Sequence, residues 1–292
     1  MKKIITNEEN IRLDKYLADN TSYSRAQVDK MIANGQVLVN KQTKKASYLI
    51  KENDEIEWEE LIQTDDIQPN FLPLKIIYED QDIMVIDKAS GVVVHPGNGN
   101  HDHTLVNGLK YYTNNLSDIN GEFRCGIVHR IDKDTSGLML VAKTNEAHQI
   151  LAEDFKVHAV KRTYIALLCG NLPYNEATID APIKRDSKHF NQMGVFEDGK
   201  PAITHLKVIK RYNNYTLVKL NLETGRTHQI RVHMKYIGYP IYNDPVYNNK
   251  KASDFGQFLH SQAIDFIHPI TKEKMHFECE LPKEFQDFLD TL

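Results

Sequence analysis

Beyond residue 75 the hydrophobic positions come in short runs or alternate with polar ones, which are the two patterns of β-strands. Apolar runs over residues 83–87 and 92–95 predict two strands around a short polar turn. A third strand is predicted over residues 163–168, and residues 218–222 alternate as in a half-buried strand. Because strands outnumber helices and do not alternate regularly with them, we predict an α+β domain over residues 75–292. In it, helices flank a mixed, largely antiparallel sheet.

Two helices are predicted within this domain. Thr144 suits the N-cap of the first helix, whose apolar side chains fall on one face, namely Ala147, Ile150, Leu151 and Phe155. The second helix follows the turn at residues 223–226, begins at Thr227 and continues through Ile237. Charged residues, among them Glu223 and Arg226, thus lie between the predicted strand at residues 218–222 and the start of this second helix.

The first 62 residues have a different pattern and form a separate predicted module. Two short helices come first, and Ser24 begins a capping box ahead of the second of them. Gly35 is placed to end that helix. Strands over residues 37–39 and 55–58 complete a small α/β unit of a size that usually occurs attached to a larger domain.

Residues 63–74 separate the two predicted domains. The segment is polar, contains two prolines and has the period of neither a helix nor a strand. We therefore predict a linker there, which makes the order of the chain a small domain over residues 1–62, the linker, and the larger domain.

Composition limits the class of protein. The chain has 292 residues, of which 41% are hydrophobic and 26% charged, as in an ordinary folded protein. It lacks an apolar run of the roughly 20 residues that a membrane span needs, and its start does not resemble a signal peptide. We predict a cytoplasmic monomer. The three cysteines are far apart and form no CxxC pair, so they suggest neither a zinc ribbon nor a disulfide framework.

The net charge of -4 does not by itself indicate a nucleic-acid partner, but the charge is unevenly distributed. Between Arg12 and Lys45 there are seven Lys or Arg residues against three Asp, whereas residues 52–60 are acidic. A local basic face binds phosphate even on an acidic protein, although most charged stretches are simply solvated.

The most unusual stretch is GIVHRIDKDTSGLMLVAK, over residues 126–143. Its charges lie between two apolar runs that we predict to be neighbouring strands. On that prediction Asp132 ends a strand, and Arg130, two residues earlier, points to the same side. A neighbouring guanidinium favours the ionised carboxylate, which suits a nucleophile or a base. An Arg–Asp pair in a surface turn is the ordinary alternative.

Two alternative functions draw on residues in or near this stretch. Asp132 and Asp134 approach the loop of aspartate-nucleophile phosphatases, but Ser136 stands where that loop needs Thr or Val. A metal site would draw on four loosely clustered histidines, namely His95, His101, His103 and His129. Because they lack a helical H-x-x-x-H pair and a convincing third ligand, we predict no metal.

A second dense motif covers residues 224–233, TGRTHQIRVH. Two Arg and two His residues surround the predicted start of a helix, where free N–H groups also attract anions. A capped helix with ordinary surface cations would have the same pattern, so the motif alone leaves its function open.

Taken together, these motifs resemble those of the RluA-type pseudouridine synthases, which isomerise uridine to pseudouridine in structured RNA. Residues 129–137 are similar to the family motif H-R-L-D-x-x-T-S-G, with Ile131 replacing Leu. Residues 161–166 resemble its K-x-Y-x-A strand, and residues 225–231 match G-R-T-H-Q-[IL]-R. Residues 258–269 resemble the closing L-H-A…F-x-H-P segment, with Ser for Ala.

The resemblance extends from about residue 76 to the C-terminus, and the first module is similar to a small RNA-binding domain first recognised in a ribosomal small-subunit protein. Residues 94–107 look most like the branch of the family that acts on large-subunit ribosomal RNA. Ala89 stands where the family often has Pro, in a turn outside the catalytic motifs.

The resemblance implies roles for individual residues. Asp132 would be the catalytic carboxylate, with Tyr164 under the flipped uracil and Arg231 paired with Asp132. Arg130 and Arg226 would contact RNA, as would the basic residues of the first module, Arg12, Lys15, Arg25 and Lys30. The family needs neither metal nor cofactor, and the carboxylate either attacks the sugar or removes a sugar proton. An RNA-binding ribosome-assembly factor that has lost catalysis is the alternative function.

Overall fold

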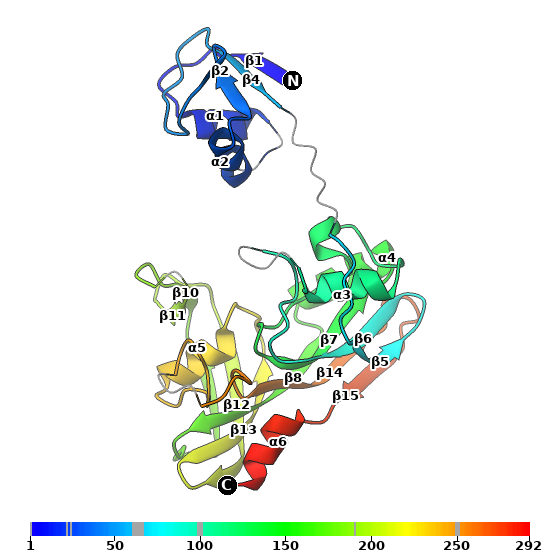
Figure 1. The fold of residues 1–292 in the computed structure, drawn as a ribbon. Coiled ribbons are helices and arrows are strands. Elements are labelled where there is room, and N and C mark those ends of the chain that lie inside the picture. Colours follow the sequence, from blue (N-terminus) through cyan, green and yellow to red (C-terminus); the bar gives the residue numbers. More distant parts are fainter. Residues whose placement is uncertain are drawn as a thin grey trace. The chain divides into compact units, whose positions relative to one another are not determined.

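The computed structural model describes two compact units, residues 1–66 and 67–292 (Figure 1). The described residues are 2–21, 23, 25–59, 67–97, 102–189, 191–248 and 252–292. Within them, no helix has the length and apolar character that crossing a membrane requires.

The first unit is a small antiparallel sheet packed on two helices. Its elements are β1 (Lys2–Ile5), α1 (Leu13–Asn20), α2 (Arg25–Ala33), β2 (Val37–Val39), β3 (Gln42–Thr43) and β4 (Glu55–Trp58). The strand order is β1-β4-β2-β3. Apolar side chains from both helices and from β2 and β4 form its core, among them Leu13, Leu17, Val28, Met31, Val37, Ile56 and Trp58.

The predicted elements of this unit are present, and the pattern missed the short strands β1 and β3. Asn40 and Lys41 both have positive φ in the tight turn between β2 and β3, and Gly35, with a φ of 74°, follows α2. The strand β1 was not predicted, because four mostly exposed residues carry little pattern. The capping role of Ser24 lies outside the described residues.

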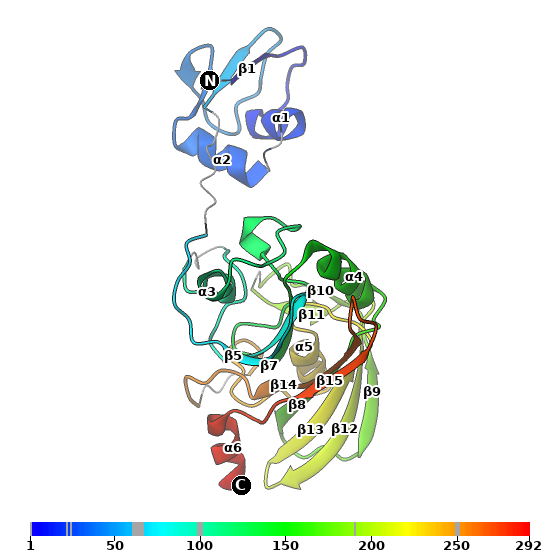
Figure 2. The ribbon, with the colours of Figure 1, turned by 90° about the vertical axis from the view of Figure 1, so that its right-hand side faces the viewer.

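The second unit is built on a nine-stranded mixed sheet (Figure 2). The strand order is β5-β6-β7-β14-β8-β13-β12-β9, with β15 also paired to β14. The bounds of the strands are β5 (Lys75–Glu79), β6 (Ile83–Lys88), β7 (Ser136–Ala142), β8 (Lys161–Cys169), β9 (Glu176–Asp180), β12 (Ile203–Tyr212), β13 (Tyr215–Leu222), β14 (Leu259–Ile267) and β15 (Lys274–Glu278). Among the described strands, only β7 and β14 pair in parallel. The predicted α+β class with a largely antiparallel mixed sheet is therefore confirmed.

Helices cover both faces of the strands β6 and β7. The helices of this unit are α3 (Leu105–Tyr112), η1 (Glu122–Arg124), α4 (Asn145–Lys156), α5 (Gln229–Tyr236) and α6 (Lys283–Asp290), and β10 (Ile183–Arg185) pairs with β11 (Met193–Val195) as a separate hairpin. Met84 and Ile86 pack with α3, whereas Ile83 and Val85 pack with α4. Burial on both faces explains why these strands have continuous apolar runs.

A glycine permits the parallel contact between β7 and β14. Gly137 has a φ of 110°, and a Cβ built there would lie 2.3 Å from the carbonyl oxygen of Ser261. No other residue fits this approach without moving the backbone. Gly137 therefore fixes where β7 begins, immediately after the loop that carries Asp132.

Three sequence predictions need correction. Residues 92–95 form no strand, because the carbonyl groups of Val93 and Val94 accept hydrogen bonds from the amides that begin α3. The second helix begins at Gln229 rather than Thr227, because His228 has a left-handed backbone. Residues 67–74 of the predicted linker pack on α3 and belong to the second unit, whereas residues 63–66 lie outside the described part.

The stretch before Asp132 is also not a strand. Ile127 makes a single bridge to Val141, and the chain then leaves the sheet as a loop until β7 begins at Ser136. The predicted strand-end position of Asp132 was therefore wrong, and the strand period no longer explains the placement of Arg130. An apolar run as short as residues 126–128 fits a buried loop as well as a strand.

Candidate active site

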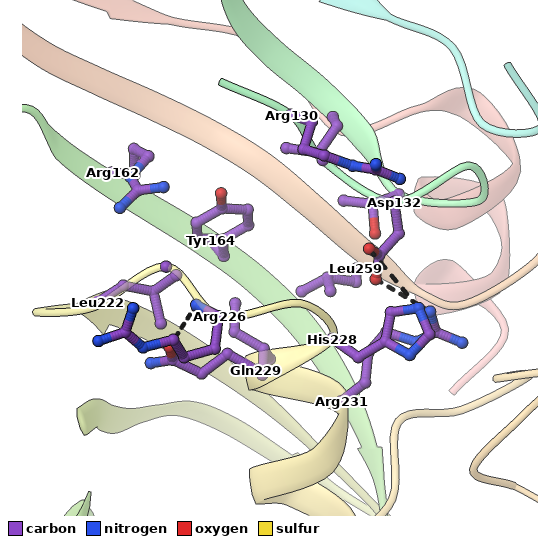
Figure 3. Close-up of a pocket in the computed structure, with 14 residues that line it drawn as sticks. Arg130, Asp132, Arg162, Tyr164, Leu222, Arg226, His228, Gln229, Arg231 and Leu259 are labelled. Carbon is purple, nitrogen blue, oxygen red and sulfur yellow. Dashed lines mark hydrogen bonds and ion pairs between the residues drawn. The ribbon is translucent and has the colours of Figure 1, made fainter. Parts of the chain in front are cut away.

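Five residues singled out from the sequence line one open pocket: Arg130, Asp132, Tyr164, Arg226 and Arg231 (Figure 3). They come from the loop before β7, from β8, from the turn after β13 and from α5. The full lining is Arg130, Ile131, Asp132, Thr135, Arg162, Tyr164, Leu222, Gly225, Arg226, His228, Gln229, Ile230, Arg231 and Leu259. The fold thus brings together motifs that lie far apart in the chain.

Asp132 is held by a buried arginine. Arg231 donates from Nη1 to the Oδ2 atom of Asp132 at 2.9 Å, so the predicted pairing of these two residues is present. The same guanidinium donates from Nε and Nη2 to the two carboxylate oxygens of Asp244, at 2.7 and 2.9 Å. A bidentate pair of this kind fixes the plane of the guanidinium as well as its position.

Asp244 anchors this network from the interior. Its side chain is fully buried and also accepts hydrogen bonds from the backbone amides of Val246 and Tyr247. Burial alone would raise the pKa of Asp244, but the hydrogen bonds and charge of Arg231 outweigh burial and lower it. Burial likewise opposes the charge of Arg231, whereas the two carboxylates raise its pKa. Arg231 therefore stays charged between two carboxylates.

The loop that carries Asp132 is fixed by side chains behind it. Lys88 is buried and donates to three backbone carbonyl groups, one of them that of Lys133. Ser90 donates to the carbonyl group of Asp134. Burial lowers the pKa of Lys88 to about 7, against the pull of nearby carboxylates. These hydrogen bonds fix the backbone on the C-terminal side of Asp132.

The turn after β13 is organised by Gln229, the first residue of α5. Its side-chain oxygen accepts from the hydroxyl group of Thr224 at 2.7 Å and from the amide of Arg226 at 2.9 Å. Its amide nitrogen donates to the backbone of Ile203 and to Thr204. Gln229 thus joins the turn to β12 and directs the following residues into the pocket.

His228 also lies next to Asp132. Its Nε2 atom lies 3.9 Å from Oδ1 of Asp132, and its Nδ1 atom lies 2.8 Å from the hydroxyl oxygen of Tyr247. That hydroxyl accepts from the amide of Met193, and burial raises the pKa of Tyr247 to about 12, so its proton is directed at Nδ1. Burial lowers the pKa of His228. The hydrogen-bond pattern thus assigns a neutral imidazole with its Nε2–H toward Asp132.

Tyr164 and Arg130 occupy different parts of the pocket. Tyr164 lies on β8 with only 5% of its surface exposed, so its ring forms a wall of the pocket. Arg130 is exposed and donates to Nε2 of His95 at 3.0 Å. Burial lowers the pKa of His95, which therefore accepts this bond as a neutral ring. Arg130 is available at the mouth of the pocket.

Several residues of this site were not predicted from the sequence. Asp244 and Tyr247 belong to no motif identified there. Arg162 lies within the motif over residues 161–166 but was given no role, and His228 was predicted only as part of a basic turn. Arg162 carried a detectable signal, because it lies two residues before Tyr164 on the same predicted strand and so on the same face. Asp244 carried none, since only the packing of α5 brings it to Arg231.

The basic residues of the first unit divide into two kinds. Arg12 and Arg25 both donate to the buried carboxylate of Asp14, at distances of 2.7 to 3.1 Å. Lys15 and Lys30 are exposed on α1 and α2. The two arginines therefore serve the fold of the unit, whatever they also contact.

The described histidines that the metal alternative used, His95, His103 and His129, do not form a group of metal donors. Nε2 of His129 accepts from the amide of Leu140 at 2.8 Å, and burial, helped by the charge of Arg162, lowers the pKa of His129 to about 3. His95 bonds Arg130, and His101 lies outside the described residues. Among the described residues, the metal alternative therefore has no cluster of these histidines to support it.

A different group of metal-type donors lies away from the pocket. Asp87, His260 and Cys279 have donor atoms within 4.8 Å of one another. Ser136 and Cys279 already contact the two ring nitrogens of His260, at 2.9 and 3.2 Å. Burial lowers the pKa of His260 to about 4 and raises that of Cys279 to about 12. Ser136, His260 and Cys279 therefore form a neutral buried hydrogen-bond chain, while Asp87 pairs with Lys75.

Comparison with family models identifies both units of the chain. Residues 82–236 match the model described as RNA pseudouridylate synthase, and residues 11–56 match the S4 domain. The first match includes Asp132, Tyr164 and Arg231, and the second includes the basic helices. The aspartate phosphatase alternative is thereby excluded.

Relatives and a solved structure agree with these matches. The chain is 46% identical to an RNA pseudouridine synthase of Bacillus subtilis, YlyB, over 96% of this chain and 94% of that protein. It is 37% identical to ribosomal large subunit pseudouridine synthase D of Escherichia coli, over 96% and 90%. The structure of human RNA pseudouridylate synthase domain containing 1 is 27% identical, covers 71% of this chain and 83% of that chain, and superposes with a TM-score of 0.60.

Proposed function

Because this chain belongs to the RNA pseudouridylate synthase family, we propose that it isomerises specific uridines of large-subunit ribosomal RNA, with Asp132 as the reacting group. The choice of RNA is supported by relatives such as the ribosomal large subunit pseudouridine synthases D of Escherichia coli and Zymomonas mobilis, which are 37% and 44% identical to this chain. The protein would then act in ribosome biogenesis. Its cytoplasmic location and monomeric state stay predictions.

The proposed reaction is an exchange of bonds at one sugar carbon. The N1–C1′ bond of uridine breaks with its electron pair moving to N1, the base turns, and a C5–C1′ bond forms. C5 then loses a proton and N1 gains one, so that product and substrate have the same composition. Because no net oxidation or reduction occurs, the proposal includes no redox cofactor.

Asp132 can assist this exchange in two ways. A carboxylate oxygen bonds to C1′ as the base leaves, or it removes a sugar proton next to C1′. Both routes need an ionised carboxylate beside the sugar. The observation that carries the proposal is the position of Asp132 in the pocket, bonded at 2.9 Å to Arg231, which Asp244 in turn holds in place.

The other pocket residues receive roles that match their surroundings. Tyr164 offers a buried ring against which a flipped uracil can stack, and its hydroxyl group is a candidate proton-transfer partner. Arg130, exposed at the mouth of the pocket, would fill the gap left in the RNA or bind its phosphate. Arg226, which donates to the carbonyl group of Pro201 at 3.0 Å, would hold the turn beside the substrate.

Tritium release tests the proposed activity. Full-length protein is incubated with unmodified ribosomal RNA that carries tritium at uridine C5. We expect release with the wild type and at least about a thousandfold slower release with Asp132→Asn, the scale of losing an essential catalytic group. Asp134→Asn is the matched control, because Asp134 lies in the same loop but does not line the pocket.

The same experiment separates the alternative function. RNA binding without any tritium release by the wild type would support an assembly factor and overturn the proposal. Tritium release that persists in Asp132→Asn would support the enzymatic activity but reject Asp132 as the reacting group. Carbodiimide-stopped primer extension then maps the new pseudouridines, and products confined to other RNAs would overturn the choice of large-subunit RNA.

A further inference from the structure

Arg162 is a buried cation for which the described residues supply no counter-ion. Only 8% of its surface is exposed, and its Nε atom is buried without a hydrogen-bond partner. Across the described parts of the chain, the guanidinium has neither a hydrogen bond nor an ion pair to a side chain or backbone group. A charge buried in this way is costly unless something satisfies it, so the site is suited to a ligand.

The surroundings hold the guanidinium in one place. It lies over the ring of Phe155, with its carbon 5.5 Å from the ring centre, and His129 stacks on the same ring at 4.3 Å. A Cβ built on Gly225 would lie 3.3 Å from its Nη1 atom and 3.4 Å from Nη2. Gly225 thus leaves the two terminal nitrogens facing the pocket, which Arg162 lines (Figure 3).

The position of Arg162 matches one edge of the substrate base. Arg162 and Tyr164 are two residues apart on β8, so both side chains leave the same face of the strand. In Figure 3 the ring of Tyr164 lies between Arg162 and Asp132. A uracil stacked on Tyr164 with its C1′ at Asp132 therefore turns its opposite edge, which carries O4, toward Arg162.

We propose that Arg162 binds O4 of the target uracil and stabilises the negative charge that the base acquires during the reaction; this rests on the proposed chemistry at Asp132. When the N1–C1′ bond breaks, the electron pair left on N1 spreads through the ring to O2 and O4. A fixed, desolvated guanidinium complements that charge and stabilises the detached base more than the uridine.

The same contact selects the base. Cytosine carries an amino group in place of O4, and its N–H donors would face the N–H donors of Arg162. A site built for an acceptor leaves its buried donors unpaired when the acceptor is absent, which makes the discrimination large. Arg162 would thus be both a catalytic and a specificity-determining residue.

A double-mutant cycle tests the contact between Arg162 and O4. Tritium release is measured for the wild type and Arg162→Met, each with uridine or 4-thiouridine at the target position, because sulfur is a weaker hydrogen-bond acceptor. With uridine we expect Arg162→Met to lower kcat about a hundredfold or more and to change KM little. The rate ratio of uridine to 4-thiouridine should fall by at least about tenfold in the variant.

Two further variants test whether the effect is specific to the Arg162 side chain. Lys161→Met changes the neighbouring basic residue, whose side chain is exposed, and should leave both the rate and the ratio unchanged. Arg162→Lys keeps the charge and should retain part of the ratio, so it provides the same measurement if Arg162→Met does not fold. Circular dichroism verifies the fold of each variant.

Two outcomes would overturn the inference. An equal ratio in the wild type and the variants would mean that Arg162 does not contact O4. A coupling that appears instead with a methylphosphonate beside the target would make Arg162 a phosphate ligand. Neither outcome touches the proposed function, which fails only if the wild type releases no tritium or if Asp132→Asn retains its activity.

Discussion

Two buried arginines line the same pocket with opposite surroundings. Arg231 bonds two carboxylates, those of Asp132 and Asp244, whereas no carboxylate in the described part of the chain pairs with Arg162. The first arginine is satisfied before substrate binds and serves to position Asp132. The second gains its partner only from a ligand, which is why their substitutions should affect stability and catalysis differently.

Removing Asp244 should destabilise the second unit. Asp244→Ala leaves Arg231 buried with only Asp132 as a partner, and breaking a buried pair typically costs about 3–5 kcal/mol of unfolding free energy. Tritium release should fall as well, because Arg231 is then free to turn away from Asp132. Urea denaturation followed by far-ultraviolet circular dichroism measures the stability.

The matched control is Asp198→Ala, which breaks the surface pair of Asp198 with Lys184. An exposed ion pair contributes little to the free energy of unfolding. The stability and activity of Asp198→Ala should therefore be close to those of the wild type. If Asp244→Ala were as stable and as active as this control, the anchoring role of Asp244 would be wrong.

At the scale of elements, one carboxylate joins the two helices of the first unit. Asp14, in the first turn of α1, bonds Arg12 just before α1 and Arg25 at the start of α2. Hydrogen bonding from Arg12, with Arg25 helping and burial opposing, lowers the pKa of Asp14 to about 2. The helices therefore owe part of their packing to charge as well as to apolar contact.

This arrangement predicts a pH-dependent stability. Since the folded pKa of Asp14 lies below its ordinary value of 3.8, its contribution is present at neutral pH and is lost as the pH falls toward about 2. Asp14→Asn should cost about 2 kcal/mol of unfolding free energy near pH 7, and the difference from the wild type should shrink below about pH 4.

Fluorescence makes this prediction measurable in the full chain. Trp58 is the single tryptophan of the sequence and lies in the core of the first unit, so its emission reports the unfolding of that unit. Asp19→Asn, an exposed change on the same helix, is the control and should have little effect. A difference between Asp14→Asn and the wild type that stays constant with pH would contradict the prediction.

For the whole molecule, we propose that the first unit binds RNA and the second unit carries out the chemistry. The S4 match covers the basic helices, whereas the described pocket residues all belong to the second unit. Because Arg12 and Arg25 are engaged with Asp14, the exposed Lys15 and Lys30 are the better test of phosphate binding by the first unit.

Neutralising these two lysines should weaken RNA binding and make the affinity less dependent on salt concentration. For Lys15→Gln with Lys30→Gln, we expect the slope of log affinity against log salt concentration to fall by about one to two, as for two lost phosphate contacts. Filter binding of ribosomal RNA across a salt series measures the slope, while Trp58 fluorescence should show an unchanged first unit.

A control with the same charge change separates specific contacts from net charge. Lys156→Gln with Lys283→Gln alters exposed lysines on α4 and α6 of the second unit, and neither lysine lines the pocket. An equal loss of slope in both double variants would reject a phosphate-binding role for the first unit.

Sequence alone determined the features that depend on local pattern. The α+β class, the strands β2, β4, β6, β7, β8 and β13, the capped helix at Thr144 and the motifs around Asp132, Tyr164 and Arg231 were readable, because period, capping and motif spacing are local properties. The other strands of the described structure were not predicted. Local pattern failed at residues 92–95 and before Asp132, where buried loops have the same apolar composition as strands.

Only the tertiary structure decided how the site is held. Arg231 meets Asp132 across 99 residues of sequence, and Asp244, His228 and Tyr247 join them because α5 packs beside the sheet. The lack of a partner for Arg162 among the described residues is likewise invisible in the chain, where acidic residues are abundant. Charge–charge contacts depend on distances between remote segments, and packing sets those distances.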